Sequence, residues 1–323
     1  MKIKVIGISI ALLLLVCCEQ KRDPHTPKVV AIATLMSHPA LDEVIGGAKE
    51  ALAEDGWIEG QNVEFLERNA NQQVPLAAAI ATEVAAQRPD IIIAVTTPMA
   101  QAMKRVATGP LVFAAVTDPV GAGLVEDISK GSDLITGTSD AWPYKDQIAL
   151  IREILPNCRR LGILYNPGEA ASQYGIIQIR KFAPELGFEL VEVGVNSVGE
   201  VRPAAESLVG RVDALFLSSD NTVIGGMVGA LRTAIAYKRP LFVGDSGTVE
   251  RGGLAAVSVG YHELGRMTGA LASRMLRGER NIPTVVAKGN EIFLNQKSAE
   301  LLGVHFSDSL IARAFRIYDS ISQ

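Results

Sequence analysis

The sequence predicts an α/β protein of two lobes, each built on a doubly wound parallel sheet with flanking helices. The first observation is a regular alternation of short apolar runs with longer segments of helical periodicity, which is typical of parallel sheets. The second is that this alternation occurs in two successive series of similar length within 323 residues. The third is that polar residues collect at the carboxyl ends of the predicted strands, the edge at which open α/β sheets bind ligands.

The first series covers about residues 28–140 and alternates strands with helices. Strands are predicted at 29–34, 63–66, 91–95 and 111–116, and helices at 39–55, 74–87 and 99–107. The segment 39–55 places an apolar residue at every third or fourth position, so one face of this helix is expected to be buried. Pro89 stops the second helix, because the residue before a proline disfavours helical backbone angles.

The second series begins after residues 140–143, where we expect the chain to cross between lobes. Strands are predicted at 161–165, 189–193, 214–218, 241–243 and 254–259, and helices at 147–155, 171–186, 200–209, 223–237 and 262–276. The strand 161–165 ends at Asn166-Pro167-Gly168, since Pro167 lacks an N–H and Gly168 tolerates positive φ.

The N-terminus is predicted to be a targeting segment that precedes the folded chain. Lys2 and Lys4 are followed by an apolar run of 12 residues at 5–16, which is too short to span a bilayer. This run ends at Cys17-Cys18, and the pattern resembles the lipobox of bacterial lipoproteins. We therefore expect a signal peptide at 1–17, lipidation of Cys18 and a tether at 18–27, with Cys17 as the alternative modified residue. A plain secretory signal or an uncleaved anchor is the simpler reading.

Composition and spacing exclude several classes of site. The net charge is −4 without a basic run, which argues against a nucleic-acid partner. Only Cys158 lies inside the predicted fold, and the four histidines are scattered, so no metal site is predicted. The chain contains neither a Gly-x-Ser-x-Gly elbow nor a phosphate-binding loop, and we predict no catalytic residues and no cofactor.

The loops after the predicted strands carry hydroxyl, amide and carboxylate groups, and they lack lysine and arginine. Such loops suit a small zwitterion, with its carboxylate held by hydroxyl and backbone N–H groups and its ammonium by a carboxylate. The simpler reading of each loop is structural, because Ser, Thr, Asp and Asn are ordinary helix caps. The candidate ligand-binding residues are Ser37, His38, Thr96, Thr97, Thr117, Asp118, Ser139, Asp140, Asn166, Glu169, Ser172, Asp220, Asn221 and Asp245.

Asp220 is the predicted partner of the solute's ammonium. It follows the strand 214–218, and we expect Thr96 and Thr97 to hold the carboxylate from the other lobe. The alternative is that Asp220 only caps the following helix, in which case Glu169 or Asp245 becomes the candidate.

The same loops, in this order, resemble the ABC transporter substrate-binding proteins of the tryptophan/tyrosine type. The matching segments include His38-Pro-Ala-Leu-Asp42, Thr96-Thr-Pro98, Val116-Thr-Asp-Pro119, Ile135-Thr-Gly-Thr-Ser-Asp140, Tyr165-Asn-Pro-Gly-Glu169, Asp220-Asn-Thr222 and Tyr261. The match covers about residues 28–305. The family pattern continues with Ala-Asn-Ser where this chain has Ala170-Ala171-Ser172, which leaves the identity of the ligand open.

The resemblance implies a type I-like periplasmic binding protein fold whose chain crosses the hinge three times. Lobe one is expected at 28–140 plus 254–290, and lobe two at 141–253 plus 291–323. The implied function is that of a monomeric, lipid-anchored solute receptor in the cell envelope. It would capture an amino acid for an ABC permease and its ATPase subunit, and the known ligands of the family are aromatic amino acids.

Two other functions remain open from the sequence. The first is a ligand-binding sensor that passes a signal to a membrane partner. The second, an α/β enzyme acting on amino acids, is the least supported because no catalytic arrangement is present.

Overall fold

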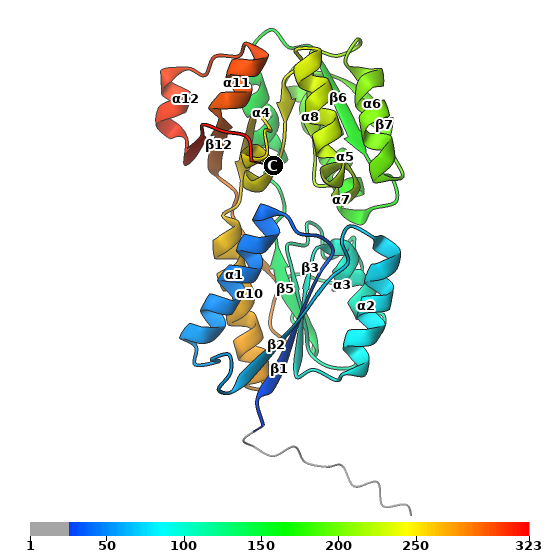
Figure 1. Ribbon diagram of the computed structural model, residues 1–323, viewed down its shortest axis with the longest axis vertical. Coiled ribbons are helices and arrows are strands. Elements are labelled where there is room, and N and C mark those ends of the chain that lie inside the picture. The colour runs from blue at the N-terminus through cyan, green and yellow to red at the C-terminus, as the bar shows by residue number, and fades with distance from the viewer. Residues whose placement is uncertain (1–25, 323) are drawn as a thin grey trace, which may run out of the picture.

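The computed structural model describes residues 26–322 and shows two lobes (Figure 1). The predicted signal peptide, Cys18 and most of the predicted tether 18–27 lie outside the described residues. Each lobe contains a largely parallel sheet with helices on both faces, so the predicted α/β class and two-lobed architecture are confirmed.

Lobe one contains a six-stranded parallel sheet in the order β11-β5-β4-β3-β1-β2. Its strands are β1 (Lys28–Thr34), β2 (Val63–Asn69), β3 (Ile91–Val95), β4 (Leu111–Ala114), β5 (Ile135–Ser139) and β11 (Val285–Val286). Helices α1 (Pro39–Glu54) and α10 (Tyr261–Leu276) pack on one face, and α2 (Val74–Ala86) and α3 (Thr97–Lys104) on the other. Every residue of the central strand β3 is buried, which explains its uninterrupted apolar sequence.

Lobe two is built on a parallel sheet in the order β7-β6-β8-β9. Its strands are β6 (Arg160–Tyr165), β7 (Glu189–Gly194), β8 (Ala214–Leu217) and β9 (Leu241–Phe242). One face is covered by α4 (Tyr144–Ile154) and α5 (Ala170–Glu185). The other is covered by the 3-10 turn η1 (Val198–Glu200), α6 (Val201–Leu208), α7 (Asn221–Gly225) and α8 (Met227–Ala236).

A second small sheet, β10-β12-β13, extends lobe two. It consists of β10 (Ala255–Ser258), β12 (Glu291–Asn295) and β13 (Arg316–Tyr318), and it is accompanied by α9 (Ser246–Glu250), α11 (Gln296–Leu302) and α12 (Asp308–Arg313). The Leu254 N–H donates to Leu241 O at 2.7 Å, and the Val243 N–H to Ala255 O at 3.2 Å. These bonds join β10 to β9.

The position of β10 differs from the lobe border expected at 253/254. Residues 254–258 belong to lobe two, because β10 pairs antiparallel with β12 and its side chains enter the core of lobe two. Val259 and Tyr261 are the first residues that enter the core of lobe one. The chain therefore passes between the lobes after Ser258.

The helix predicted at 223–237 is two helices in the structure, α7 and α8, separated at Gly226. A Cβ atom at position 226 would lie 2.6 Å from Cβ of Val201 on α6, so this turn packs closely against α6.

The chain passes between the lobes three times, after β5, after β10 and after β11, as predicted. These segments lie side by side: a Cβ atom at Gly289 in the third would be 3.0 Å from Pro143 in the first and 3.2 Å from Val259 in the second. They form a compact hinge on one side of the molecule.

The two sheets direct their carboxyl edges toward each other (Figure 1). In each sheet the strand order reverses at one point, between β1 and β3 in lobe one and between β6 and β8 in lobe two. Ligands of open α/β sheets bind at such switch points. The loops after these four strands therefore face one another between the lobes.

Candidate functional site

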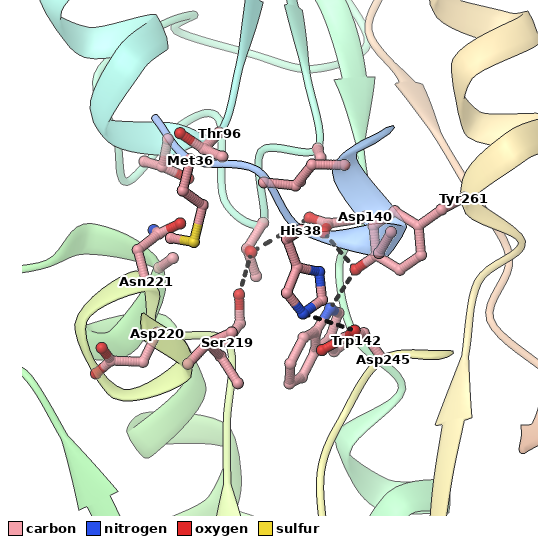
Figure 2. Close-up of a pocket in the computed structure, with 17 residues that line it drawn as sticks. Met36, His38, Thr96, Asp140, Trp142, Ser219, Asp220, Asn221, Asp245 and Tyr261 are labelled. Carbon is pink, nitrogen blue, oxygen red and sulfur yellow. Dashed lines mark hydrogen bonds and ion pairs between the residues drawn. The ribbon is translucent and has the colours of Figure 1, made fainter. Parts of the chain in front are cut away.

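A cavity lies between the lobes at the two switch points (Figure 2). Lobe one contributes loops after β1, β3, β4 and β5, and lobe two contributes loops after β6, β8 and β9. The lining residues are Met36, His38, Ala40, Leu41, Thr96, Thr97, Ala115, Thr117, Asp140, Trp142, Ala171, Ser219, Asp220, Asn221, Ile224, Asp245 and Tyr261. Neither lysine nor arginine occurs among these described lining residues.

Thr96, at the end of β3, is the most unusual residue of the lobe-one wall. Its backbone has φ +84° and ψ 153°, a conformation that a β-branched residue rarely adopts. Its side-chain oxygen is buried and has no hydrogen-bond partner within residues 26–322. Ala115, at the end of the neighbouring β4, also has positive φ, +51°. Strained backbone and an unpaired buried hydroxyl at one cavity are typical of a ligand site.

Two helices of lobe one begin at the cavity without a side-chain cap. The N-cap residues are His38 for α1 and Thr96 for α3, and neither side chain accepts a hydrogen bond from its helix. The first-turn N–H groups of a helix have no intrahelical acceptor and carry partial positive charge. The part of the cavity wall around these two helix N-termini is therefore suited to an anionic group.

In lobe two the N-termini of α7 and α9 are capped by the carboxylates of Asp220 and Asp245. Asp220 accepts from Val223 N at 2.9 Å, from Ser172 Oγ at 2.7 Å and from Asn166 N at 2.5 Å. Its carboxylate points away from the cavity in Figure 2. Burial and the charge of Glu169 raise the pKa of Asp220 to about 6. This geometry favours the capping alternative over the predicted role of Asp220 as the ammonium partner.

Asp245 has a similar capping role at α9. Its Oδ1 accepts from Thr248 N at 2.8 Å, and its Oδ2 accepts from Thr248 Oγ1 at 2.5 Å. His38 Nε2 lies 3.9 Å from Oδ1, and burial lowers the pKa of His38.

Asp140, at the end of β5, is a buried carboxylate of the lobe-one wall. It accepts from Tyr261 OH at 2.9 Å and from Thr117 Oγ1 at 3.2 Å. Tyr261 OH in turn accepts from Trp142 Nε1 at 3.1 Å. Burial raises the pKa of Asp140 to about 6. Because a carboxylate offers about four lone-pair sites, Asp140 retains acceptor capacity for a cationic group.

The remaining walls are apolar. Met36, Leu41 and Ala115 line the lobe-one side, and Ala171 and Ile224 the lobe-two side. Trp142, from the first hinge segment, packs its ring against the Gly244 backbone, where a Cβ atom would lie 1.8 Å from the ring. A solute with an apolar side chain could be enclosed here.

Two hydrogen-bonded contacts join the lobes beside the cavity. Thr117 Oγ1 of lobe one lies 2.8 Å from Ser219 Oγ of lobe two. His38 Nε2 lies 3.2 Å from Thr248 Oγ1. The lobes are therefore in direct contact at two places beside the cavity.

Eight of the residues predicted from the sequence line the cavity, and six do not. The lining ones are His38, Thr96, Thr97, Thr117, Asp140, Asp220, Asn221 and Asp245. Ser37 is exposed and accepts from Asn69, and Asp118 accepts from the Gly121 N–H in its own turn. Ser139 donates to Thr117 O.

The other three, Asn166, Glu169 and Ser172, hold the loops of lobe two together. Glu169 accepts from the backbone N–H groups of Asn221 and Thr222 at 3.0 and 2.9 Å. Asn166 donates from Nδ2 to Thr222 Oγ1, and Ser172 donates to Asp220. These polar side chains stabilise the loops of lobe two. Residue type alone does not distinguish this structural role from ligand binding.

The candidates predicted from the sequence do not include nine of the lining residues: Met36, Ala40, Leu41, Ala115, Trp142, Ala171, Ser219, Ile224 and Tyr261. Most of these are apolar side chains, whose signal in the sequence is the same as that of the core. Ser219 lies directly beside the predicted Asp220, so the loop itself was identified.

Two kinds of feature are absent from the described part of the chain. Residues 26–322 contain no group of three or more His, Cys, Asp and Glu side chains placed to hold a metal ion. Within the same residues, no helix has the length and apolar character needed to cross a membrane.

Residues 29–318 match the family model described as ABC transporter substrate binding protein. A curated relative, the "Tyrosine-binding protein" of Clostridioides difficile (strain R20291), is 32% identical over 287 residues, which cover 88% of this chain and 83% of the relative.

Solved structures of relatives show the same fold. An ABC domain from Streptococcus pneumonia in complex with L-Trp has a TM-score of 0.87 at 28% identity, covering 90% of this chain and 100% of the other. A substrate-binding protein with adhesive properties from Clostridium difficile, in its ligand-free, open form, has a TM-score of 0.67 at 32% identity. That match covers 87% of this chain and 96% of the other. The TM-score is higher for the L-Trp complex than for the ligand-free, open structure, although the identity is lower. This difference agrees with the hydrogen bonds that join the two lobes of this chain.

Proposed function

Because this chain belongs to the family of ABC transporter substrate-binding proteins, we propose that it captures a zwitterionic amino acid between its lobes and delivers it to an ABC permease. The solute's carboxylate would meet Thr96 and the uncapped N-termini of α1 and α3. Its ammonium would meet Asp140, and its side chain would lie against the apolar walls.

The observation that carries this proposal is that the lobe-one wall of the cavity has one part suited to an anion and another, at Asp140, suited to a cation. Lobe one offers an unpaired hydroxyl and two uncapped helix N-termini, both of which favour an anion. Asp140 offers a buried carboxylate with remaining acceptor capacity. A zwitterion matches both parts of this wall, whereas an oxyanion would lie beside the Asp140 carboxylate without a lysine or arginine among the lining residues to balance it.

The apolar walls and the relatives favour an aromatic side chain. Met36, Leu41, Ile224 and Trp142 provide a surface for a flat ring. Two of the relatives that are at least 28% identical have names that state a ligand: a tyrosine-binding protein and a complex with L-Trp.

The same proposal includes the cellular setting predicted from the sequence. A signal peptide at 1–17 and lipidation of Cys18 would anchor the receptor, as a monomer, at the membrane of the cell envelope. A permease with its ATPase subunit would accept the closed, loaded form and import the solute. Closure that depends on ligand provides the physical signal for this recognition.

A thermal-shift screen of the full chain against amino acids, sugars and oxyanions tests the proposal. L-Trp or L-Tyr at about 100 times its dissociation constant should stabilise the protein by about 2.7 kcal/mol, a shift of several degrees. Stabilisation by a sugar or phosphate alone would refute the proposal.

The variant Thr96→Val tests whether the amino acid found in the screen binds at the Thr96 hydroxyl. It keeps the β-branched shape and removes the hydroxyl, so the shift caused by the amino acid should decrease. Thr233→Val is the matched control, because Thr233 is buried in α8 and lies outside the cavity. It should leave the shift unchanged.

A further inference from the structure

We infer that Gly247 is a positioning residue for lobe closure, because only glycine allows the N-termini of α1 and α9 to meet. This inference rests on the proposed function, and it adds the residue on which the closed, ligand-holding arrangement depends. Gly247 is the second residue of α9 in lobe two.

The contact at Gly247 is made across the lobes. A Cβ atom at this position would lie 2.7 Å from the backbone N of Ala40 and 2.8 Å from Cε1 of His38. His38 Nδ1 would follow at 3.2 Å, so all three nearest atoms belong to lobe one. Real Cβ atoms essentially never approach other heavy atoms closer than 3.0 Å. A side chain at position 247 would therefore keep the lobes apart.

The groups that Gly247 meets cannot easily move. Ala40 N belongs to the backbone of the first turn of α1, a helix of 16 residues packed against α10. The His38 ring is 5% exposed, and Figure 2 shows it between the cavity and Asp245. The same ring bonds Thr248, the residue after Gly247. The glycine and this hydrogen bond thus form one contact point for closure.

The requirement for glycine at position 247 is steric and not conformational. Gly247 is helical and is absent from the residues with positive φ in the described chain. Alanine is the better helix former, and lobe two by itself contains none of the three nearest atoms. The substitution Gly247→Ala should therefore leave the fold of each lobe intact and act on closure alone.

A second glycine at the lobe interface gives a graded comparison. A Cβ atom at Gly225 would lie 3.0 Å from Oε1 of Gln72 in lobe one. This neighbour is the far end of a flexible side chain, which can turn aside. Gly225→Ala should affect closure much less than Gly247→Ala.

Titration calorimetry of the full chain with L-Trp and L-Tyr tests the inference. Gly247→Ala should bind at least about tenfold more weakly than the parent, because the apparent affinity falls with the population of the closed form. Gly46→Ala is the matched control, since Gly46 lies in α1 with no atom within 4 Å of its added Cβ. It should bind like the parent, and Gly247→Ala binding like the parent would overturn the inference.

A cross-linking measurement separates this inference from the proposed function. The pair Thr117→Cys and Ser219→Cys places two thiols where the hydroxyl oxygens lie 2.8 Å apart across the interface between the lobes. In a full chain that also carries Cys17→Ser and Cys18→Ser, oxidation without ligand reports visits to the closed form. Adding Gly247→Ala should slow the cross-link at least about tenfold, and adding Gly46→Ala should not.

The calorimetric and cross-linking experiments distinguish an error in the proposed ligand from an error in the role of Gly247. If the parent binds neither amino acid, the proposed aromatic ligand is wrong, while the cross-linking rates still decide the role of Gly247. If Gly247→Ala cross-links as fast as its parent, the inference about closure is wrong whatever the protein binds.

Discussion

Two aspartates at the cavity, Asp220 and Asp140, differ in how many hydrogen bonds their carboxylates accept. Asp220 accepts three hydrogen bonds within lobe two, whereas Asp140 accepts two. Asp140 is therefore the stronger candidate for the ammonium of the solute, and Asp220 for a helix cap.

Asp140→Asn and Asp220→Asn should separate these two roles. Loss of a charge-assisted hydrogen bond costs about 1.5–3 kcal/mol, so Asp140→Asn should weaken L-Trp binding about tenfold to a hundredfold. Asp220→Asn should change affinity little, because asparagine caps a helix about as well as aspartate. Calorimetry of both variants gives the comparison. Weakened binding in Asp220→Asn alone would restore the assignment made from the sequence.

The buried Asp140 also gives the stability of the protein a specific pH dependence. Its pKa is raised by burial from 3.8 to about 6, so the folded state disfavours the ionised form. The stabilising effect of the protonated carboxyl is fully present below pH 3.8 and is lost as pH rises through about 6.

Asp140→Asn should therefore gain stability relative to the parent as pH rises from 4 to 7. The difference between the two pKa values corresponds to about 3 kcal/mol at most. Urea unfolding of both proteins at several pH values measures the change. A constant difference across this range would show that Asp140 titrates in the folded state as it does in the unfolded state.

At the scale of elements, the N-terminus of α7 is held by a residue from another loop. Glu169, which precedes α5, accepts from the backbone N–H groups of both Asn221 and Thr222. It also accepts from the side chains of the same two residues, at 2.9 and 2.5 Å. This clamp positions Asn221 at the cavity wall.

Glu169→Gln should reduce the free energy of unfolding by about 1–3 kcal/mol, because a charged acceptor of four hydrogen bonds becomes neutral. Chemical denaturation measures the loss. Glu185→Gln, at the exposed C-terminal end of α5, is the control and should leave the free energy of unfolding nearly unchanged. Equal stability of the two variants would contradict the proposed clamp.

The strand pattern of the fold could be predicted because the strands are short and apolar. The run at 91–95 is fully buried as β3, and the turn Asn166-Pro167-Gly168 ends β6 as expected. The lobe that receives residues 254–258 could not be predicted, since an apolar strand fits either core equally well. The break at Gly226 was hidden because the apolar residues on both sides of it suit a single helix.

The site could be predicted as loops but not as individual contacts. Thr96 was identified as a loop hydroxyl, yet its strained backbone and its missing partner are visible only in the structure. Glu169 and Asp220 are the same residue types as ligand-binding acids. In the folded protein, however, their carboxylates already accept hydrogen bonds from backbone N–H groups at the start of α7.

At the scale of the whole molecule, the anchor stays a prediction from the sequence. Cys18→Ser should release the protein from the membrane fraction, because the modified thiol would be absent. Labelling with a fatty acid, followed by fractionation, checks this result. Label retained on Cys18→Ser and lost from Cys17→Ser would move the modification to the neighbouring residue.

Closure couples the two lobes into one binding unit. The contacts Thr117–Ser219 and His38–Thr248 join the lobes beside the cavity, while the three hinge segments pack together at Pro143, Val259 and Gly289. A solute that contacts both lobes stabilises this arrangement by its differential affinity for the closed form.

The most direct test is a calorimetric titration of the full chain with L-Trp and two analogues that each lack one charge. Tryptamine lacks the carboxylate, and indole-3-propionate lacks the ammonium. L-Trp should bind with a stoichiometry of one, and both analogues at least about tenfold more weakly, because each loses one charge-assisted contact. No binding of L-Trp, or an analogue bound as tightly as L-Trp, would contradict capture of an aromatic zwitterion between the lobes.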